Sequence, residues 1–316
     1  MDPIFSLIER TPAFAVLSSD IGGGRLGHAY LFAGDEVSAE AIMLLGAVRA
    51  LCPEGGCQKC ATCRRILAGI HPDVLSFPEG GKYTAEGMEA LIAEIYRRPT
   101  EGEKKFLLLK GADSMNLTCQ NKFLKTLEEP PGDCHLFLGA AREDALLPTV
   151  RSRVRRLEIP PFLAEQLLPF ARAVCRPEEA ELFAALGQGS PSEVRKLAEG
   201  RGRELFELAL TLLNRCRKVE DAAYFSGELA ARKEDFLPLC DILSLLLSDA
   251  LKEHCGAEGQ IKGLTAEQNR WKKQFSNAAL AEIIRVIKDC RKRLTYNAGF
   301  AYTADALLFA LVRGRS

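Results

Sequence analysis

The 316-residue sequence predicts an α/β protein whose first half forms a parallel, doubly wound sheet and whose last third is entirely helical. In the first half, short apolar runs alternate with segments of helical periodicity, a pattern typical of parallel sheets covered by helices. Beyond Phe162 the strand signal fades and apolar residues recur at helical spacing. A chain of this length also exceeds what one hydrophobic core usually serves, so two or three domains are expected.

The strands and helices of the first half follow from its apolar runs, taken in order. We expect a strand at 28–33, a helix at 39–51, a strand at 105–109, a helix at 121–127 and a strand at 135–138. Pro130 and Pro131 end the second of these helices, because proline cannot continue a helix interior and restricts the residue before it. Pro160 and Pro161 then form a stiff boundary after the α/β part.

Helices are expected throughout the remainder. Ser190 is a suitable cap for a helix that begins at Pro191, and glycines at 200 and 202 mark a further junction. Beyond this junction, apolar residues have helical spacing at 204–216, 236–255 and 277–293. The boundaries predict three parts, at 1–159, 160–201 and 202–316.

The charge balance argues against a dedicated duplex-DNA binder. Lys and Arg total 42, as do Asp and Glu, so the formal net charge is zero, whereas phosphate neutralisation normally requires a basic excess. No apolar run approaches the roughly 20 residues that span a bilayer, and the N-terminus does not have the pattern of a signal peptide. We therefore expect a cytoplasmic protein without membrane association, whose 11 cysteines are mostly reduced.

The segment after the first strand has one feature of a phosphate-binding loop. Gly34 can begin the pattern G-x-x-x-x-G-K-[ST], but Ala39 stands at the last glycine, Glu40 at the lysine and Ala41 at the Mg²⁺ ligand. A carboxylate ~4 Å from a polyphosphate costs on the order of 1 to 4 kcal/mol. A single glycine is weak evidence, so a plain strand-to-helix turn is the other interpretation.

Four cysteines lie close together in the sequence with the spacing C-x4-C-x2-C-x2-C: Cys52, Cys57, Cys60 and Cys63. Four thiolates suit a tetrahedral structural Zn²⁺, and Gly55 and Gly56 permit the turns that this requires. Four protein ligands leave no position for water, so the metal would not be catalytic. An iron–sulfur cluster or four free cysteines are the alternatives, and His71 is expected in a turn and not as a ligand.

Residues 121–153 contain a characteristic set: Asn121, Leu124, Lys125, Leu127, Glu128, Glu129, Pro130, Pro131, Leu146, Leu147, Pro148, Thr149, Ser152 and Arg153. This set resembles the core of bacterial DNA polymerase III clamp-loader subunits, which are AAA+ proteins. In that family the arginine of a Ser-Arg-Cys motif reaches into the ATP site of a neighbouring subunit. The resemblance implies that Arg153, preceded by Ser152, is an arginine finger acting in trans, with Val154 in place of the cysteine.

Five arginines crowd this region, and most such runs are solvated faces. We give that interpretation to Arg142, Arg151, Arg155 and Arg156, because the resemblance places only Arg153 at the finger position. A guanidinium suits the task, since it can stabilise charge on a transferring phosphoryl group. Lys125, Glu128 and Glu129 are expected to be structural or to lie at a subunit contact.

The resemblance also implies that this chain does not hydrolyse ATP. Under this resemblance, the segment that contains Gly34, Glu40 and Ala41 is a degenerate phosphate loop. Lys110 stands where family ATPases place a metal-binding aspartate, Gly111 replaces the catalytic glutamate, Ala140 and Ala141 replace a threonine sensor, and Ser192 stands where the family often has an arginine. The family also carries a four-cysteine zinc module after the first helix of the sheet domain, usually with more residues between the first two cysteines than here.

The resemblance implies an AAA+ module at 1–159 with a zinc-binding insertion at 52–63, a small helical lid at 160–201 and a helical collar at 202–316. Within the family the chain looks like the non-hydrolysing delta-prime type. That type works beside gamma/tau and delta subunits in a heteropentamer of the DNA-directed DNA polymerase holoenzyme, which loads the sliding clamp onto primer–template DNA. An active gamma/tau-type ATPase and a zinc-containing DNA-binding module outside replication remain as alternatives.

Overall fold

A computed structural model describes residues 2–78, 81–257, 261, 264–295 and 299–315. The chain divides into two compact units, one formed by the residues up to Phe162 together with Ser190–Ser192, and the other by the remaining residues. The further division of the helical part into lid and collar stays a prediction.

The first unit contains one parallel sheet, which in the described residues has the strand order β2-β3-β4-β1-β5. The strands are β1 (Ala29–Ala33), β2 (Val74–Phe77), β3 (Lys105–Leu109), β4 (Cys134–Ala140) and β5 (Arg155–Glu158). β1 lies between β4 and β5, with Leu31 opposite Leu138 on one side and Arg156 on the other. The predicted fold class, a parallel α/β sheet followed by helices, is confirmed.

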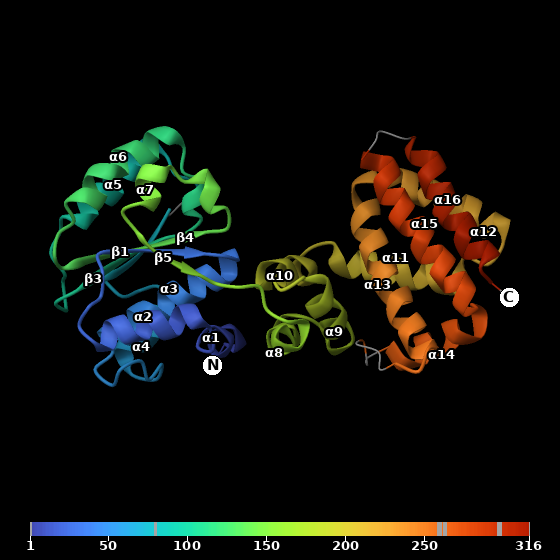
Figure 1. Ribbon diagram of the computed structural model, residues 1–316, viewed down its shortest axis with the longest axis horizontal. Coiled ribbons are helices and arrows are strands. Elements are labelled where there is room, and N and C mark those ends of the chain that lie inside the picture. The colour runs from blue at the N-terminus through green and yellow to red at the C-terminus, as the bar shows by residue number, and fades with distance from the viewer. Residues whose placement is uncertain (1, 79–80, 258–260, 262–263, 296–298, 316) are drawn as a thin grey trace. The chain divides into compact units, whose positions relative to one another are not determined.

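Helices cover both faces of this sheet, as Figure 1 shows: α1 to α4 lie on one side and α5 to α7 on the other. Their bounds are α1 (Pro3–Ile8), α2 (Pro12–Gly22), α3 (Glu36–Leu51), α4 (Ala61–Leu67), α5 (Ala85–Ile95), α6 (Leu117–Glu128) and α7 (Pro148–Arg151). The face towards α5 and α6 packs Leu107 and Leu136 of the strands in one buried cluster with Phe123. Because both faces are covered, the central strands are continuous apolar runs.

The opposite face of the sheet is aromatic and packs against α3. The rings of Phe32 and Phe137 meet edge to face, 5.3 Å apart between centroids. Gly46 of α3 allows close approach, since a Cβ there would lie 2.8 Å from the Phe137 ring. This packing fixes the start of α3 at the carboxyl ends of the strands, where parallel sheets place their sites.

The helices after Phe162 are α8 (Ala164–Val174), α9 (Pro177–Leu186), α10 (Pro191–Glu199), α11 (Gly202–Arg215), α12 (Val219–Ala231), α13 (Phe236–His254), α14 (Thr265–Gln274), α15 (Asn277–Thr295) and α16 (Phe300–Arg313). α10 begins at Pro191, as predicted. Leu243, Leu246 and Leu247 of α13 are fully buried, which accounts for the apolar character of that helix. In the described part of the chain, no helix has the length and apolarity needed to cross a membrane.

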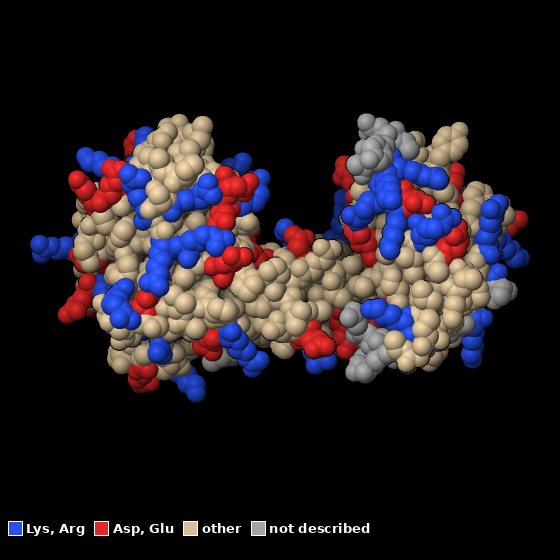
Figure 2. Space-filling model, viewed as in Figure 1, with Lys and Arg blue, Asp and Glu red and all other residues tan. Residues whose placement is uncertain are grey.

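Charged residues of both signs are mixed over the surface in view (Figure 2). The mixture agrees with the zero formal net charge of the chain. A uniformly basic face, the usual mark of a duplex-DNA binder, is not visible from this side.

Candidate functional site

The four clustered cysteines converge on one point beside α4. Their sulfur atoms all lie within 4.8 Å of one another, with separations of 3.7 Å for Cys52 to Cys57, 3.8 Å for Cys52 to Cys60 and 4.0 Å for Cys57 to Cys63. Tetrahedral coordination with Zn–S bonds of about 2.3 Å places sulfurs about 3.8 Å apart. The four side chains could therefore hold a metal ion of this size.

Backbone amides around the cluster point at the sulfurs. The amide of Cys57 donates to Cys52 at 3.4 Å and the amide of Cys60 donates to Cys57 at 3.3 Å. Cys60 also caps α4, because its sulfur accepts from the amide of Cys63. Burial and hydrogen bonding to Cys52 raise the pKa of the Cys63 thiol, so a fully ionised cluster needs a cation.

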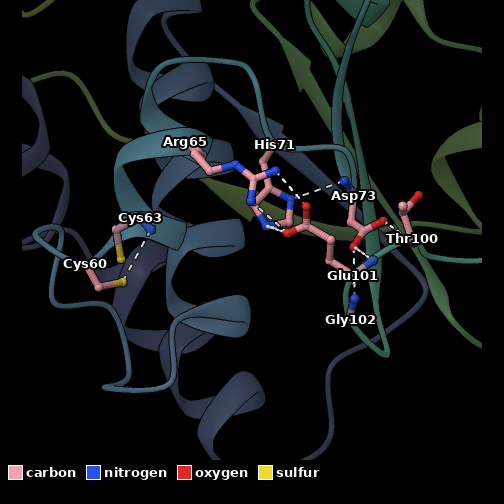
Figure 3. A network of polar contacts seen from close by, with 8 residues as sticks. All are labelled: Cys60, Cys63, Arg65, His71, Asp73, Thr100, Glu101 and Gly102. Atoms are coloured by element: carbon pink, nitrogen blue, oxygen red, sulfur yellow. Dashed lines mark hydrogen bonds and ion pairs between the residues drawn. The ribbon is translucent and has the colours of Figure 1, made fainter.

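A polar network ties α4 to the segment that precedes β3 (Figure 3). Arg65 of α4 makes a bidentate ion pair with Glu101, at 2.7 and 2.8 Å. The buried carboxylate of Asp73 accepts hydrogen bonds from the amides of Thr100, Glu101 and Gly102. These contacts connect the cysteine cluster to the sheet through side chains far apart in sequence.

The first turns of α3 line a cavity of about 380 Å³ whose wall includes Glu40, Lys110 and Ala141. Glu40 and Lys110 form an ion pair with each other. Lys110, which follows β3, thus neutralises Glu40, which stands where a phosphate loop has its lysine. Gly34 is required for packing, since a Cβ there would lie 2.8 Å from the carbonyl oxygen of Ile159.

Arg153 follows α7 on the surface of the first unit, after Ser152, the C-cap residue of that helix. Its guanidinium pairs with Glu128 of α6 at 2.6 Å and donates to the carbonyl of Thr149 at 2.9 Å. The Ser152 hydroxyl donates to the same carbonyl. Both members of the Arg153–Glu128 pair are at least one-third exposed, and such pairs contribute about 0 to 1 kcal/mol, so release of Arg153 costs little.

α6 also forms hydrogen bonds with the segment that precedes α7 and Arg153. The buried Gln120 side chain donates to the carbonyls of Met115 and Ala145 and accepts from the amide of Leu147. Leu147 is the N-cap residue of α7. One helix therefore contacts both the start of α7 and the guanidinium beyond its end.

The neighbouring arginines pair with carboxylates of the same unit. Arg156 binds Glu143, and Arg155 binds Asp20 at 2.6 Å. Arg142 is three-quarters exposed and lies 3.9 Å from Asp113. Arg142, Arg155 and Arg156 are therefore exposed but ion-paired, and their interpretation as a solvated basic face stays a prediction.

Comparison with known proteins assigns the family. Residues 10–163 match the family described as "DNA polymerase III, delta subunit". The chain is 31% identical over 272 residues to the DNA polymerase III subunit delta' of Escherichia coli strain K12, covering 81% of this chain and 80% of that protein. The chain belongs to the delta-prime family of DNA polymerase III subunits. The resemblance inferred from the sequence is thereby confirmed.

Two further comparisons differ in how much of the chain they cover. The subunit delta' of Pseudomonas aeruginosa is 35% identical over 198 residues, which span 59% of this chain and 60% of that relative. Among solved structures, a DNA polymerase III gamma subunit-related protein of Thermotoga maritima is similar with a TM-score of 0.45 and 18% identity, over 96% of this chain and 99% of that one.

Three contacts of this delta-prime family member were missed from its sequence: Glu40 with Lys110, Glu128 with Arg153, and Arg65 with Glu101. Sequence reasoning judged Glu40 and Lys110 separately, as two residues unsuited to ATP hydrolysis. Their opposite charges were the available signal: Glu40 lies in the helix that follows β1 and Lys110 follows β3, and parallel strands of one sheet end at the same edge.

The network in Figure 3 predicts a loss of stability in mild acid. Burial, and then the Arg65 guanidinium, lower the pKa of His71, whose Nδ1 accepts from the amide of Asp73. Since the unfolded chain takes up this proton first, the contribution of His71 is present above pH about 6.5 and is lost as the pH falls towards its lower folded pKa. We expect the melting temperature to fall between pH 7.5 and 5.5.

His71→Asn tests this assignment, since the asparagine side-chain oxygen can still accept the hydrogen bond from Asp73. We expect this variant to have a flatter dependence of melting temperature on pH than the parent, whereas His28→Asn, which replaces an exposed histidine, keeps the slope. An unchanged slope in His71→Asn would exclude His71 as the source.

Proposed function

We propose that this chain is the non-hydrolysing subunit of a DNA polymerase III clamp loader and supplies Arg153 to the ATP site of a neighbouring subunit. The observation that carries the proposal is the surface position of Arg153 after α7, with a guanidinium whose contacts to Glu128 and to the Thr149 carbonyl are exposed and lie within its own unit. A guanidinium that is released at low cost can stabilise charge on a phosphoryl group in another chain.

The site after β1 supports a role without hydrolysis. Glu40 stands where a phosphate loop requires a lysine, and Lys110 stands where the metal-binding strand requires an aspartate. The two residues neutralise each other. Ala41 cannot ligate Mg²⁺. These substitutions remove the cation, the metal and the hydroxyl ligand that phosphoryl transfer needs.

We therefore expect the isolated chain to show no saturable binding of Mg-ATP up to about 1 mM, a limit that corresponds to about 4 kcal/mol of binding free energy. Isothermal titration and a fluorescent ATP analogue provide independent measurements. Micromolar binding with turnover would instead favour the gamma/tau-type ATPase.

The partners follow from this role. We expect gamma/tau and delta subunits in a heteropentamer, with the sliding clamp and primer–template DNA reached through the complex, in the cytoplasm. The test is co-purification with the other polymerase III subunits, followed by ATPase assays with and without this chain. Failure to co-purify, together with salt-dependent duplex binding by the chain alone, would favour the DNA-binding module.

The cysteine cluster would hold a structural Zn²⁺. Sulfur separations of 3.7 to 4.0 Å support tetrahedral coordination. Four protein ligands give the ion no open position for substrate, so its proposed work is to fix the loop that precedes α4.

A further inference from the structure

The first amides of α3 have partners inside the chain. The N-terminus of a helix exposes amides that have no acceptor in the helix, and in phosphate loops these amides bind the nucleotide. Here the amide of Ser38 donates to one carboxylate oxygen of Asp35 at 3.0 Å. The amide of Val37 donates to the hydroxyl oxygen of Ser192 at 3.1 Å.

The second carboxylate oxygen of Asp35 joins the two segments. It accepts from the amide of Ser192 at 3.0 Å and from the hydroxyl of Ser190. Ser190–Ser192 lie about 155 residues further along the chain but belong to the same compact unit as Asp35. One carboxylate therefore binds the start of α3 through one oxygen and the start of α10 through the other.

The burial and the charge around Asp35 favour these intrachain hydrogen bonds over the binding of a nucleotide phosphate. An anion at a helix N-terminus is stabilised by the helix dipole, and a carboxylate there supplies the negative charge that a phosphate would bring. Ser38 is fully buried and Ser192 is only 9% exposed. The Glu40–Lys110 pair lies one turn further along α3 and places another carboxylate near the same loop.

We infer that Asp35 is a built-in substitute for a nucleotide phosphate, which fixes Ser190–Ser192, at the start of α10, against the start of α3 whether or not nucleotide is present. A phosphate entering the loop would have to displace both Asp35 and Ser192 from their amides. The inference concerns this chain alone and holds whether or not Arg153 acts on a neighbouring subunit.

Amide hydrogen exchange of the full chain, measured by NMR with and without Mg-ATP, tests the inference. In the parent, we expect slow exchange at Val37, Ser38 and Ser192 without nucleotide and no change when Mg-ATP is added. Asp35→Asn keeps the cap on Ser38 but turns a donor towards the Ser192 amide, so exchange at Ser192 should accelerate about tenfold, as for one lost charge-assisted hydrogen bond.

Glu36→Gln is the matched control, because it removes the same charge from the exposed adjacent residue and should leave exchange at Ser192 unchanged. Ser192→Ala supplies a second measurement if Asp35→Asn folds poorly: exchange at Val37 should accelerate while Ser192 stays slow. Equal exchange at Ser192 in Asp35→Asn and the parent would overturn the inference, as would protection in the parent that requires Mg-ATP.

Discussion

Replacing Arg153 with alanine should lower ATP hydrolysis at the adjoining site of a reconstituted clamp loader by roughly 10³-fold, the lower end of what arginine fingers contribute. The expected cause is loss of the guanidinium that would stabilise charge on the transferring phosphoryl group. The measurement is the rate of phosphate release with clamp and primed DNA present, together with the rate of clamp loading.

Three further variants separate this role from a structural one. Arg153→Lys keeps the charge but loses the planar fork, so most of the defect should remain. Arg151→Ala removes an exposed arginine two residues earlier and should have no effect. Glu128→Gln removes the intrachain partner of Arg153 and should not reduce the rate. Parent-level hydrolysis in Arg153→Ala, with the complex intact, would show that Arg153 is not a finger.

The sheet could be predicted where burial leaves a simple pattern. β1, β3 and β4 are buried at every position and are apolar apart from Lys105 and His135, which is typical of central parallel strands. β5 has the sequence Arg-Arg-Leu-Glu with only Leu157 buried, because it is an edge strand. Its hydrogen bonds to β1, and not its side chains, make it a strand.

The candidate sites could likewise be predicted where their residues are close in sequence, and could not where the residues are far apart. The cysteine cluster is local, so spacing alone predicted that four sulfurs would meet. The Glu40–Lys110 pair joins residues 70 positions apart and the Asp35–Ser192 bond joins residues 157 positions apart. Sequence reasoning identified Glu40, Lys110 and Ser192 as unsuited to ATP chemistry, but their pairing depends on strand order and on the return of the chain at Ser190–Ser192.

Removing one cysteine ligand should have the largest effect on stability. We expect one zinc ion per chain in anaerobically purified parent protein and loss of that zinc in Cys60→Ser, measured by elemental mass spectrometry. Serine at this position can still cap α4, so the variant isolates the metal contribution from the capping contribution. Structural zinc contributes on the order of 10 kcal/mol in small peptides, and several kcal/mol is expected here.

The loss of stability on zinc removal should extend beyond residues 52–63, because the Arg65–Glu101 ion pair and the Asp73 hydrogen bonds connect α4 to residues 100–102. Without metal, α4 loses its fixed N-terminus, so amides at 100–102 should exchange faster together with those at 52–63. Cys255→Ser, which replaces an exposed cysteine elsewhere in the chain, should retain zinc and stability. Iron with visible absorption in the parent would assign an iron–sulfur cluster instead, and absence of both metals would leave four free thiols whose separations arise from the loop alone.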